Sequence, residues 1–328
     1  MIKRKAILIL NVYIIFILVI IILPIVLCYE TTSNTLYVDY DGSKEYSSIS
    51  EAINNALDGD IIYVYSGIYP GYFLINKSIS IIGENRDSTV VSGAFTPPVL
   101  GGVFEITADN VTISNLTIKY GIIPKYGKAA SDLYLFGIGI YIQSSNNSII
   151  GNNIQQNYGY GIRINNSKNT IISDNNITNP RSLGIFLENS DNNIIMKNNI
   201  TKNERGIGIH NSSNNNSIYF NNFINNSNYN AWDEGQNLWY NTNEKMGNYW
   251  DKYYGYDDNN DNIGDITKII PGTENEDRYP LMKPYEDMMM DQVLIDEGTL
   301  YFMLIIGCII AIIVCLPIAY YWRKKMGY

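Results

Sequence analysis

The residues with the clearest potential for chemistry lie in one short acidic segment, 257–265. Its first, third, fifth and ninth positions carry oxygen-bearing side chains, and its seventh offers a backbone carbonyl. Tight loops with this spacing surround a hard cation with oxygen atoms. The segment therefore predicts a calcium site formed by Asp257, Asn259, Asp261, Ile263 and Asp265.

This segment departs from the usual calcium loop at two positions. Asn262 stands where glycine is usual, and the turn can still form because asparagine enters the left-handed region more readily than most residues. Lys268 stands where a bidentate glutamate is usual, so the ligand set is incomplete. We expect weak binding, and the alternative interpretation is a solvated acidic turn.

A second group of candidates, Arg163, Glu188 and His210, could act on carbohydrate. Paired carboxylates supply the acid and the base that cleave a glycosidic bond. Glu188 and His210 occupy the same place in successive copies of a sequence repeat, in line with Gln143 and Asn165. The sequence thus offers three candidate catalytic residues, and the alternative is that they form surface ion pairs and hydrogen bonds.

The repeat that positions these residues has a period of 23. Asn-Asn followed by Ile or Phe begins at Asn152, Asn175, Asn198 and Asn221. Each copy lies among short alternating apolar runs broken by Asn, Ser and Gly, which is typical of strands and tight turns. Three short strands in 23 residues make one coil of a single-stranded, right-handed parallel β-helix, an all-β fold in which residue i lies over residue i+23 at roughly 4.8 Å.

The same alternation predicts an asparagine ladder inside the solenoid. It points the first Asn of each pair inward at a bend, while Asn199 and its equivalents face outward. A buried amide must find hydrogen-bond partners, and stacked Asn side chains can bond to one another and to the turn backbone.

Both ends of such a solenoid need caps. Ser48-Ile-Ser-Glu51 is a capping box, and Ile49, Ala52, Ile53, Ala56 and Leu57 then fall on one side of a short helix that would cover the first coil. At the other end, large aromatic residues can close the last coil or stack on sugars. We expect Trp250 and most of this group to form the cap: Trp232, Trp239, Tyr240, Tyr249, Trp250, Tyr253, Tyr254 and Tyr256.

Several of these motifs together resemble known β-helix families. Tyr37-Val-Asp39, Gly59-Asp60 and Gly67-x-Tyr69 resemble the opening of pectin-lyase-like surface proteins. The coils, with Gly247-Asn-Tyr-Trp250-Asp251 and Tyr279-Pro-Leu-Met282, resemble the NosD-type family and its carbohydrate-binding and sugar-hydrolysis repeats, especially archaeal envelope proteins. The resemblance spans about residues 35–285 and implies the fold, whereas it leaves the reaction open.

Charge and hydropathy indicate where the protein works. The net charge of −9 argues against a nucleic-acid partner. Two apolar stretches, 6–28 and 300–322, each have Lys and Arg at the outer end, which predicts an exterior domain anchored in the cell membrane. We divide the chain into a signal peptide or signal anchor (1–28), the β-helix (29–250), a cap with the candidate calcium loop (251–285), an acidic linker (286–298), a transmembrane helix (299–322) and a cytoplasmic tail (323–328).

The NosD resemblance raises the question of copper. The chain has one histidine, His210, and its three cysteines all fall in or beside the apolar segments. Met288-Met-Met290 could offer soft thioethers to Cu(I), although such a run is also typical of apolar packing. Copper is therefore not expected, and calcium is the cofactor that the sequence favours.

The exterior placement also makes N-glycosylation chemically permissible. Asn-x-Ser/Thr begins at Asn76, Asn110, Asn115, Asn146, Asn165, Asn176, Asn199, Asn211, Asn215 and Asn225.

For function, we expect a non-catalytic surface or adhesion module of the cell envelope that binds polysaccharide. The alternatives are a carbohydrate-active enzyme (a lyase, hydrolase or epimerase) and, third, a metal-delivery accessory protein.

Overall fold

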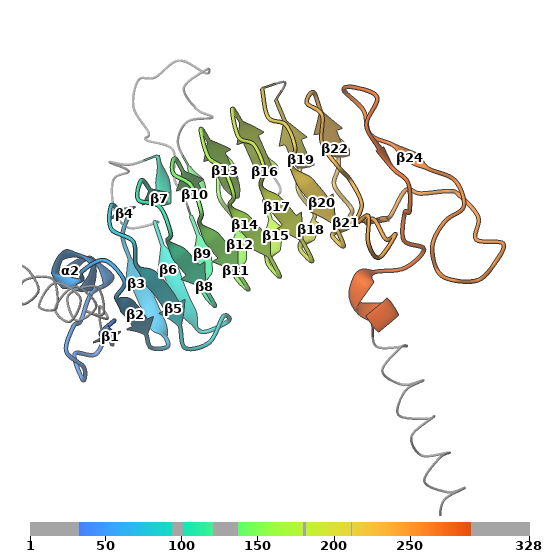
Figure 1. Ribbon diagram of the computed structural model, residues 1–328. Coiled ribbons are helices and arrows are strands. Elements are labelled where there is room, and N and C mark those ends of the chain that lie inside the picture. The colour runs from blue at the N-terminus through green and yellow to red at the C-terminus, as the bar shows by residue number, and fades with distance from the viewer. Residues whose placement is uncertain (1–32, 94–100, 121–136, 180–181, 211, 290–328) are drawn as a thin grey trace, which may run out of the picture.

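The chain folds into a parallel β-solenoid with three long sheets (Figure 1). The computed structural model describes residues 33–93, 101–120, 137–179, 182–210 and 212–289. Each coil contributes one strand to each sheet in turn, so neighbours in a sheet are parallel and come from successive coils. The all-β solenoid predicted from the 23-residue repeat is confirmed.

We name the sheets A, B and C in the order in which a coil visits them. Sheet A contains β1 (Thr35–Val38), β2 (Ile61–Val64), β5 (Ser80–Gly83), β8 (Thr112–Ser114), β11 (Ser148–Ile150), β14 (Ile171–Ser173), β17 (Ile194–Met196) and β20 (Ser217–Tyr219). Sheet B contains β3 (Gly67–Pro70), β6 (Thr89–Ser92), β9 (Thr117–Lys119), β12 (Asn153–Gln155), β15 (Asn176–Thr178), β18 (Asn199–Thr201), β21 (Asn222–Ile224) and β23 (Tyr249–Trp250). Sheet C contains β4 (Phe73–Ile75), β7 (Gly102–Ile106), β10 (Ile138–Ile142), β13 (Ile162–Asn165), β16 (Leu183–Glu188), β19 (Arg205–Ile209) and β22 (Tyr229–Asp233).

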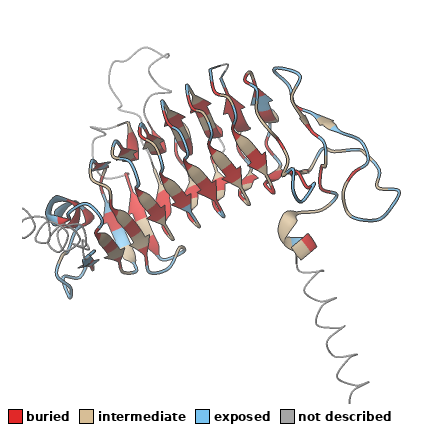
Figure 2. Ribbon diagram, in the orientation of Figure 1, coloured by how far each residue is buried: buried red, intermediate tan, exposed pale blue. Residues whose placement is uncertain are grey.

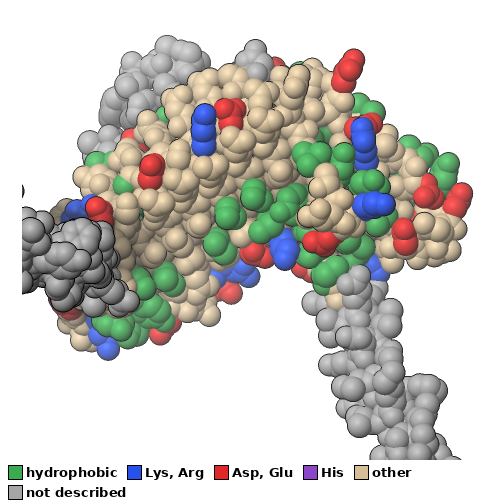
Figure 3. Space-filling view, in the orientation of Figure 1, with side chains coloured by type: hydrophobic (Ala, Val, Ile, Leu, Met, Phe, Trp, Pro, Cys, Tyr) green, Lys and Arg blue, Asp and Glu red, His purple; other side chains and the backbone are tan. Residues whose placement is uncertain are grey.

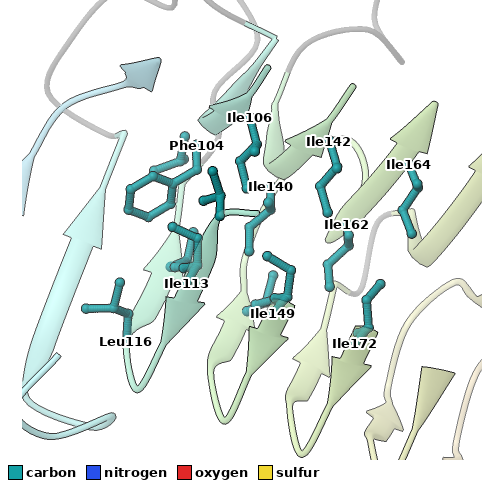
Figure 4. Close-up of a cluster of buried hydrophobic side chains, with 14 of the residues drawn as sticks. Phe104, Ile106, Ile113, Leu116, Ile140, Ile142, Ile149, Ile162, Ile164 and Ile172 are labelled. Atoms are coloured by element: carbon teal, nitrogen blue, oxygen red, sulfur yellow. The ribbon is translucent and has the colours of Figure 1, made fainter. Parts of the chain in front are cut away.

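Inward-facing aliphatic side chains stack in rows along the solenoid axis. Ile149, Ile172, Ile195 and Ile218 are register partners in sheet A and are all fully buried. Figure 4 shows such rows meeting inside the coils, and Figure 2 shows that burial follows the strands while the turns are exposed. The core is therefore built by repetition of the same position, coil after coil.

The turns between strands use the left-handed backbone region repeatedly. The residues at 151, 174, 197 and 220, one per coil between sheets A and B, all have φ between 57° and 68°. Gly and Asp occupy two of these positions, but Lys197 and Phe220 occupy the others. The stacking of the coils thus imposes the turn conformation even on residues that disfavour it.

The predicted internal asparagine ladder is confirmed. The Nδ2 atom of Asn175 donates to Oδ1 of Asn198 at 3.0 Å, and Nδ2 of Asn198 donates to Oδ1 of Asn221 at 2.9 Å. The ladder begins at Asn152, whose Nδ2 lies 3.1 Å from Oδ1 of Asn175, and it reaches Asn248 beyond the last repeat. Every amide in this row also bonds to backbone groups, so no buried donor is stranded.

The N-terminal end is covered by helix α2 (Ile49–Asn55). The hydroxyl of Ser48 accepts a hydrogen bond from the backbone N–H of Glu51 at 3.2 Å, as the capping box predicts. Ile49, Ala52 and Ile53 are buried, but Leu57 is exposed, so its predicted place on the buried side is wrong. Leu57 lies beyond the end of the helix and no longer follows its periodicity.

The C-terminal cap is built around two buried Trp–Asp pairs. Nε1 of Trp239 donates to Asp233 at 2.8 Å, and Nε1 of Trp250 donates to Asp277 at 2.9 Å. Trp250 stacks on Phe223 with ring centroids 4.4 Å apart and thereby closes the last coil. The predicted cap role of Trp250 agrees with this arrangement, and a short hairpin of β24 (Lys268–Ile269) and β25 (Glu276–Asp277) supplies Asp277.

The chain then returns to the flank of the solenoid. Residues 285–289 are helical, and Tyr285 stacks on Phe220 with centroids 4.5 Å apart. The Glu286 carboxylate accepts a hydrogen bond from the Asn222 side chain and so holds this helix against the solenoid. The acidic linker predicted at 286–298 therefore begins within a helix that packs on the solenoid. Figure 3 shows hydrophobic side chains gathered over this end of the molecule.

Membrane-spanning segments were predicted at the two ends of the chain. Within the described residues, no helix has the length and apolar character that crossing a membrane requires. The predicted segments 1–28 and 299–322, the tail 323–328 and most of the linker 286–298 lie outside those residues.

Candidate functional site

The outer face of sheet C carries a row of large side chains in strand register. One outward position per strand is occupied in turn by Glu105, Tyr141, Arg163, Phe186, Gly208 and Trp232. Strand pairing holds successive members of such a row at roughly 4.8 Å. This face contains all three residues that the sequence offered as catalytic candidates.

Arg163 and Glu188 are brought together on this face. Their side chains form an ion pair with Nη2 and Oε2 at 2.7 Å, and the Arg163 side chain is nearly buried. The guanidinium also lies over the rings of Tyr141 and Tyr160, at 5.2 Å and 5.8 Å from their centroids. The pair is thus tightly held between aromatic side chains and fixes the carboxylate of Glu188.

His210 lies one coil beyond Glu188, as the repeat predicted. The backbone N–H of His210 donates to the carbonyl of Leu187 at 3.0 Å, which places the histidine beside Glu188 at the end of strand β19. Its ring meets Phe186 edge to face, with centroids 5.1 Å apart. The aromatic contact, together with the position next to Glu188, places His210 at the rim of a hollow.

That hollow is centred on Gly208. Glycine replaces the large side chain of the outer row between Phe186 on one strand and Trp232 two strands away, and the end of the Leu183 side chain fills part of that space. Two strand spacings, roughly 9.6 Å, separate the backbones that carry the two aromatic walls. We call this hollow the Gly208 slot.

The rim of the slot combines aromatic and polar groups around a volume of about 380 Å³. Tyr160 stacks on Phe186 at 5.0 Å and supports that wall. Trp232 forms the other wall with 39% of its surface exposed. The remaining lining residues are Leu183, Arg205, Ile209, His210, Tyr229 and Glu234.

The polar groups of the slot are held in defined positions. The Glu234 carboxylate accepts a hydrogen bond from the Trp232 indole at 3.2 Å, and the Arg205 guanidinium lies over the Tyr229 ring at 5.7 Å. Burial raises the pKa of Tyr229, against a lowering by the neighbouring Arg205 charge. An aromatic slot with a few fixed polar groups can bind a ligand that has both apolar faces and hydroxyl groups.

A second hollow of about 470 Å³ adjoins the slot at Glu234. Its lining residues come from the turn before β20, from the turn after β22 and from the cap: Asn214, Glu234, Gly235, Gln236, Thr273, Glu274 and Asn275. A ligand longer than one ring could therefore extend from the slot toward the cap.

The predicted calcium loop is closed by its own backbone. Asp257 accepts hydrogen bonds from the N–H groups of Asp261 and Asn262, and Asp261 accepts one from Ile263 at 2.8 Å. Asn262 has φ of 66°, so its expected left-handed conformation is confirmed. Among the described residues no three acidic, His or Cys side chains are grouped for a metal, and calcium binding by Asp257, Asn259, Asp261, Ile263 and Asp265 stays a prediction.

Sequence reasoning found only part of the slot. It offered His210 as a catalytic candidate and Trp232 in the aromatic group expected to form the cap, but it missed Gly208. The only available signal for Gly208 was its place in the repeat, where other copies carry Tyr141, Arg163 and Phe186. The side chains of Arg205 and Tyr229 face outward because the alternation of inward and outward side chains along β19 shifts at Gly206. A Cβ at Gly206 would meet the Asn230 carbonyl at 2.2 Å. That shift depends on the backbone of the next coil.

The fold and this face define the class of the protein, a parallel β-helix with an aromatic slot on one side. The family model described as "Periplasmic copper-binding protein (NosD)" matches residues 53–255, which is more than half of the chain. The chain belongs to the NosD family, and the resemblance seen in the sequence to NosD-type, pectin-lyase-like right-handed β-helices is confirmed. No curated protein sequence gives a significant match.

Several solved structures share the architecture at low identity. Pectate lyase Pel9A aligns over 67% of this chain and 74% of its own, with 13% identity and a TM-score of 0.44. An alginate lyase from Paenibacillus sp. covers 66% of this chain and 80% of its own at 16% identity and a TM-score of 0.43. Pectin methylesterase from carrot covers 64% and 84% at 14% identity and a TM-score of 0.39.

The family description names copper, which runs against our expectation from the sequence. Among the described donors, His210 contacts the Phe186 ring, and Met246, Met288 and Met289 share one apolar cluster with Phe220. Met290 lies outside the described residues. The family description therefore weighs against the expectation that copper is absent.

Proposed function

We propose that this protein is a non-catalytic module of the cell envelope that binds polysaccharide through the Gly208 slot. The observation that carries this proposal is the hollow of about 380 Å³ over Gly208, which Phe186 and Trp232 line on the outer face of sheet C. A pyranose ring presents apolar C–H faces and a rim of hydroxyl groups. Aromatic walls suit the faces, and Arg205, His210 and Glu234 suit the hydroxyl groups.

The arrangement of carboxylates favours binding over cleavage. Glu188 is tied to Arg163 at 2.7 Å, and Glu234 accepts from the Trp232 indole, so both are engaged as acceptors. A glycosidase needs one protonated and one free carboxyl group on opposite sides of the scissile bond. If Glu188, Arg163 and His210 instead act on the sugar, the protein is a lyase, hydrolase or epimerase, and this is the second candidate.

The placement of the domain is also part of the proposal. The apolar segments 6–28 and 300–322 with their flanking Lys and Arg favour an exterior domain held by a C-terminal membrane anchor. Helix 285–289 packs beside β21 on sheet B, whereas the slot lies on sheet C (Figure 1). The slot would then be free of the segment that leads to the anchor.

The experiment is to incubate the purified protein with a panel of envelope and plant polysaccharides and to score both retention and newly formed sugar ends. We expect retention of at least one polysaccharide without new ends. Release of reducing or unsaturated ends would support the enzyme instead. Trp232→Ala should weaken retention at least tenfold, whereas Tyr254→Ala, which truncates a ring that is 90% exposed on the cap, should not.

The family description favours copper delivery as a third candidate. Its test is the copper content of the protein purified from its own cells, together with titration by Cu(I). Stoichiometric copper that survives dialysis would favour delivery of the metal, and its loss in Met288→Leu would locate the ligands. Exterior placement is tested separately by protease treatment of intact cells, which should remove the solenoid and leave the C-terminal segment in the membrane fraction.

A further inference from the structure

The structure separates eight of the ten Asn-x-Ser/Thr triplets into two groups, while Asn76 falls in neither and Asn211 lies outside the described residues. One edge of the solenoid, at the turn from sheet C to sheet A, carries an asparagine in the left-handed region in five successive coils. These are Asn110, Asn146, Asn169, Asn192 and Asn215, with φ between 56° and 60°. Their backbones are linked coil to coil, as in the hydrogen bonds from Asn146 N–H to the carbonyl of Lys168 and from Asn192 N–H to that of Asn214.

The side chains of this row point away from the solenoid. All five residues are exposed, because each lies at the tip of its turn while the next residue faces inward and is buried. Nδ2 of Asn110, Asn146, Asn192 and Asn215 donates no hydrogen bond to any described residue, whereas Nδ2 of Asn169 donates to Asn146. Four amides of the row are thus available for chemistry, and three of them, those of Asn110, Asn146 and Asn215, belong to an Asn-x-Ser/Thr triplet.

A hydroxyl group two residues later is present in the same three coils. Thr112, Ser148 and Ser217 occupy one outward position at the start of strands β8, β11 and β20, and Ile171 and Ile194 fill the same position in the two coils between. The complete triplet therefore occurs at Asn110, Asn146 and Asn215, and only the hydroxyl is missing at Asn169 and Asn192.

Other triplets are engaged in the fold. Asn176 and Asn199 form a second ladder on the outer surface of sheet B, where Nδ2 of Asn199 donates to Asn176 at 3.2 Å and Nδ2 of Asn176 donates to Asn153 at 3.0 Å. Nδ2 of Asn115 donates to the Gly83 carbonyl at 2.7 Å, and Oδ1 of Asn165 is buried. A bulky group on the Nδ2 atoms of Asn115, Asn176 or Asn199 would replace one N–H group and crowd the neighbour to which that atom is bonded.

We propose that Asn110, Asn146 and Asn215 are N-glycosylated, and that Asn225, an exposed left-handed residue at another edge, is a fourth site. The acceptor Nδ2 attacks C1 of a sugar carried on a lipid-linked phosphate or diphosphate donor. The C1–N bond forms as the C1–O bond breaks, the lipid phosphate leaves with the bonding electrons, and the amide loses one proton. Glycans on ladder asparagines would prevent stacking, so folded chains carry them only at exposed tips.

This inference rests on the exterior placement proposed above but not on sugar binding by the slot. The full chain is purified from its own cells, and its peptides are analysed by mass spectrometry. We expect glycan on the peptides of Asn110, Asn146, Asn215 and Asn225 and none on those of Asn176 and Asn199. Asn215→Gln and Ser217→Ala should both remove one glycan mass, and Ser217→Thr should retain it.

The sharper test creates a site. Ile194→Ser completes Asn192-Asn-Ser at a tip that matches Asn215 in backbone and exposure, and the isoleucine it replaces is only half-buried. We expect this variant to gain one glycan. Glycan on Asn176 or Asn199, absence of glycan on the native tips, or failure of Ile194→Ser to gain one while Asn215 is occupied would each overturn the proposal.

Discussion

The indole Nε1–H of Trp250 donates a hydrogen bond to the buried carboxylate of Asp277, 2.9 Å away. The same carboxylate accepts from the backbone N–H of Asn248 at 2.8 Å, and Asn248 is the last member of the internal asparagine ladder. Gly247 leaves the space for it, since a Cβ there would collide with the carboxylate. The motif Gly247-Asn-Tyr-Trp250 thus ends the solenoid by joining its main ladder to one acidic side chain.

Two further inner ladders end in the same way, whereas the outer ladder of Asn176 and Asn199 donates in the opposite direction. Asn193, Asn216 and Asn237 lead to Asp233, and Asn203, Asn226 and Asn230 lead to Asp251. In each row the Nδ2 groups all donate toward the C-terminal end, so the amide dipoles add and their positive ends meet a carboxylate. We infer that each of the three aspartates, Asp277, Asp233 and Asp251, is the acceptor that completes its inner ladder.

The first prediction concerns pH. Burial raises the pKa of Asp277 to about 7, against the lowering by its N–H donors. A carboxyl with a raised folded pKa binds its proton more tightly in the native state, so this contribution is complete below about pH 4 and is lost as the pH rises to about 7. The unfolding free energy of the wild type should therefore fall across this interval, relative to that of Asp277→Asn, by up to about 1.4 kcal/mol per pH unit. The melting temperature of the wild type should fall with it.

Thermal denaturation at several pH values measures this difference. Asp258→Asn, which changes an exposed carboxylate on the cap loop, should run parallel to the wild type. Parallel curves for Asp277→Asn and the wild type would show that Asp277 does not titrate in the interval.

The second prediction compares two adjacent asparagines. Asn198→Leu leaves the donors of Asn175 without their acceptor and should cost about 1–3 kcal/mol of unfolding free energy. Asn199 faces outward, as the alternation predicted, but it belongs to the outer ladder with Asn176 and Asn222. Its bonds are partly solvated, so we expect Asn199→Leu to cost about 0.5–1.5 kcal/mol. Urea unfolding would measure both, and a larger loss for Asn199→Leu would reverse the assignment.

The third prediction concerns the loop at 257–265. Asp257, Asp261 and Asp265 already accept backbone hydrogen bonds, so calcium must compete with a closed turn. If it binds, millimolar calcium should raise the melting temperature relative to chelator, more than magnesium does, and Asp261→Ala should abolish the increment. Equal melting temperatures with calcium and with chelator would leave the loop as an acidic turn.

The coils were predictable because one rule repeats. The 23-residue period, the inward aliphatic rows and the Asn175 to Asn221 ladder all follow from alternation at a fixed length. The docking of Tyr285 on Phe220 was not predictable, because it joins segments 65 residues apart with no shared pattern. The outer ladder was missed although the same period aligns its asparagines, because an outward amide can bond to water and need not bond to its neighbour in the next coil.

The candidate site also has one part that the repeat predicted and one part that it did not. Register alone placed Glu188 in line with Asn165 and next to His210, and the structure has this arrangement. The slot is defined by an absent side chain at Gly208 and by the shifted alternation at Gly206, both of which need the three-dimensional path of the neighbouring strands. A pattern of residue types does not reveal a gap.

The central claim is tested most directly by filling the Gly208 slot. In Gly208→Phe the added side chain would occupy the space between Phe186 and Trp232, and the closest group to its Cβ, Leu183 Cδ2 at 2.6 Å, is the movable end of a side chain. We predict that this variant keeps the circular dichroism of the wild type and loses at least tenfold of its retention on the polysaccharides that the wild type binds, while Tyr254→Ala retains them. Undiminished retention by folded Gly208→Phe would contradict the account.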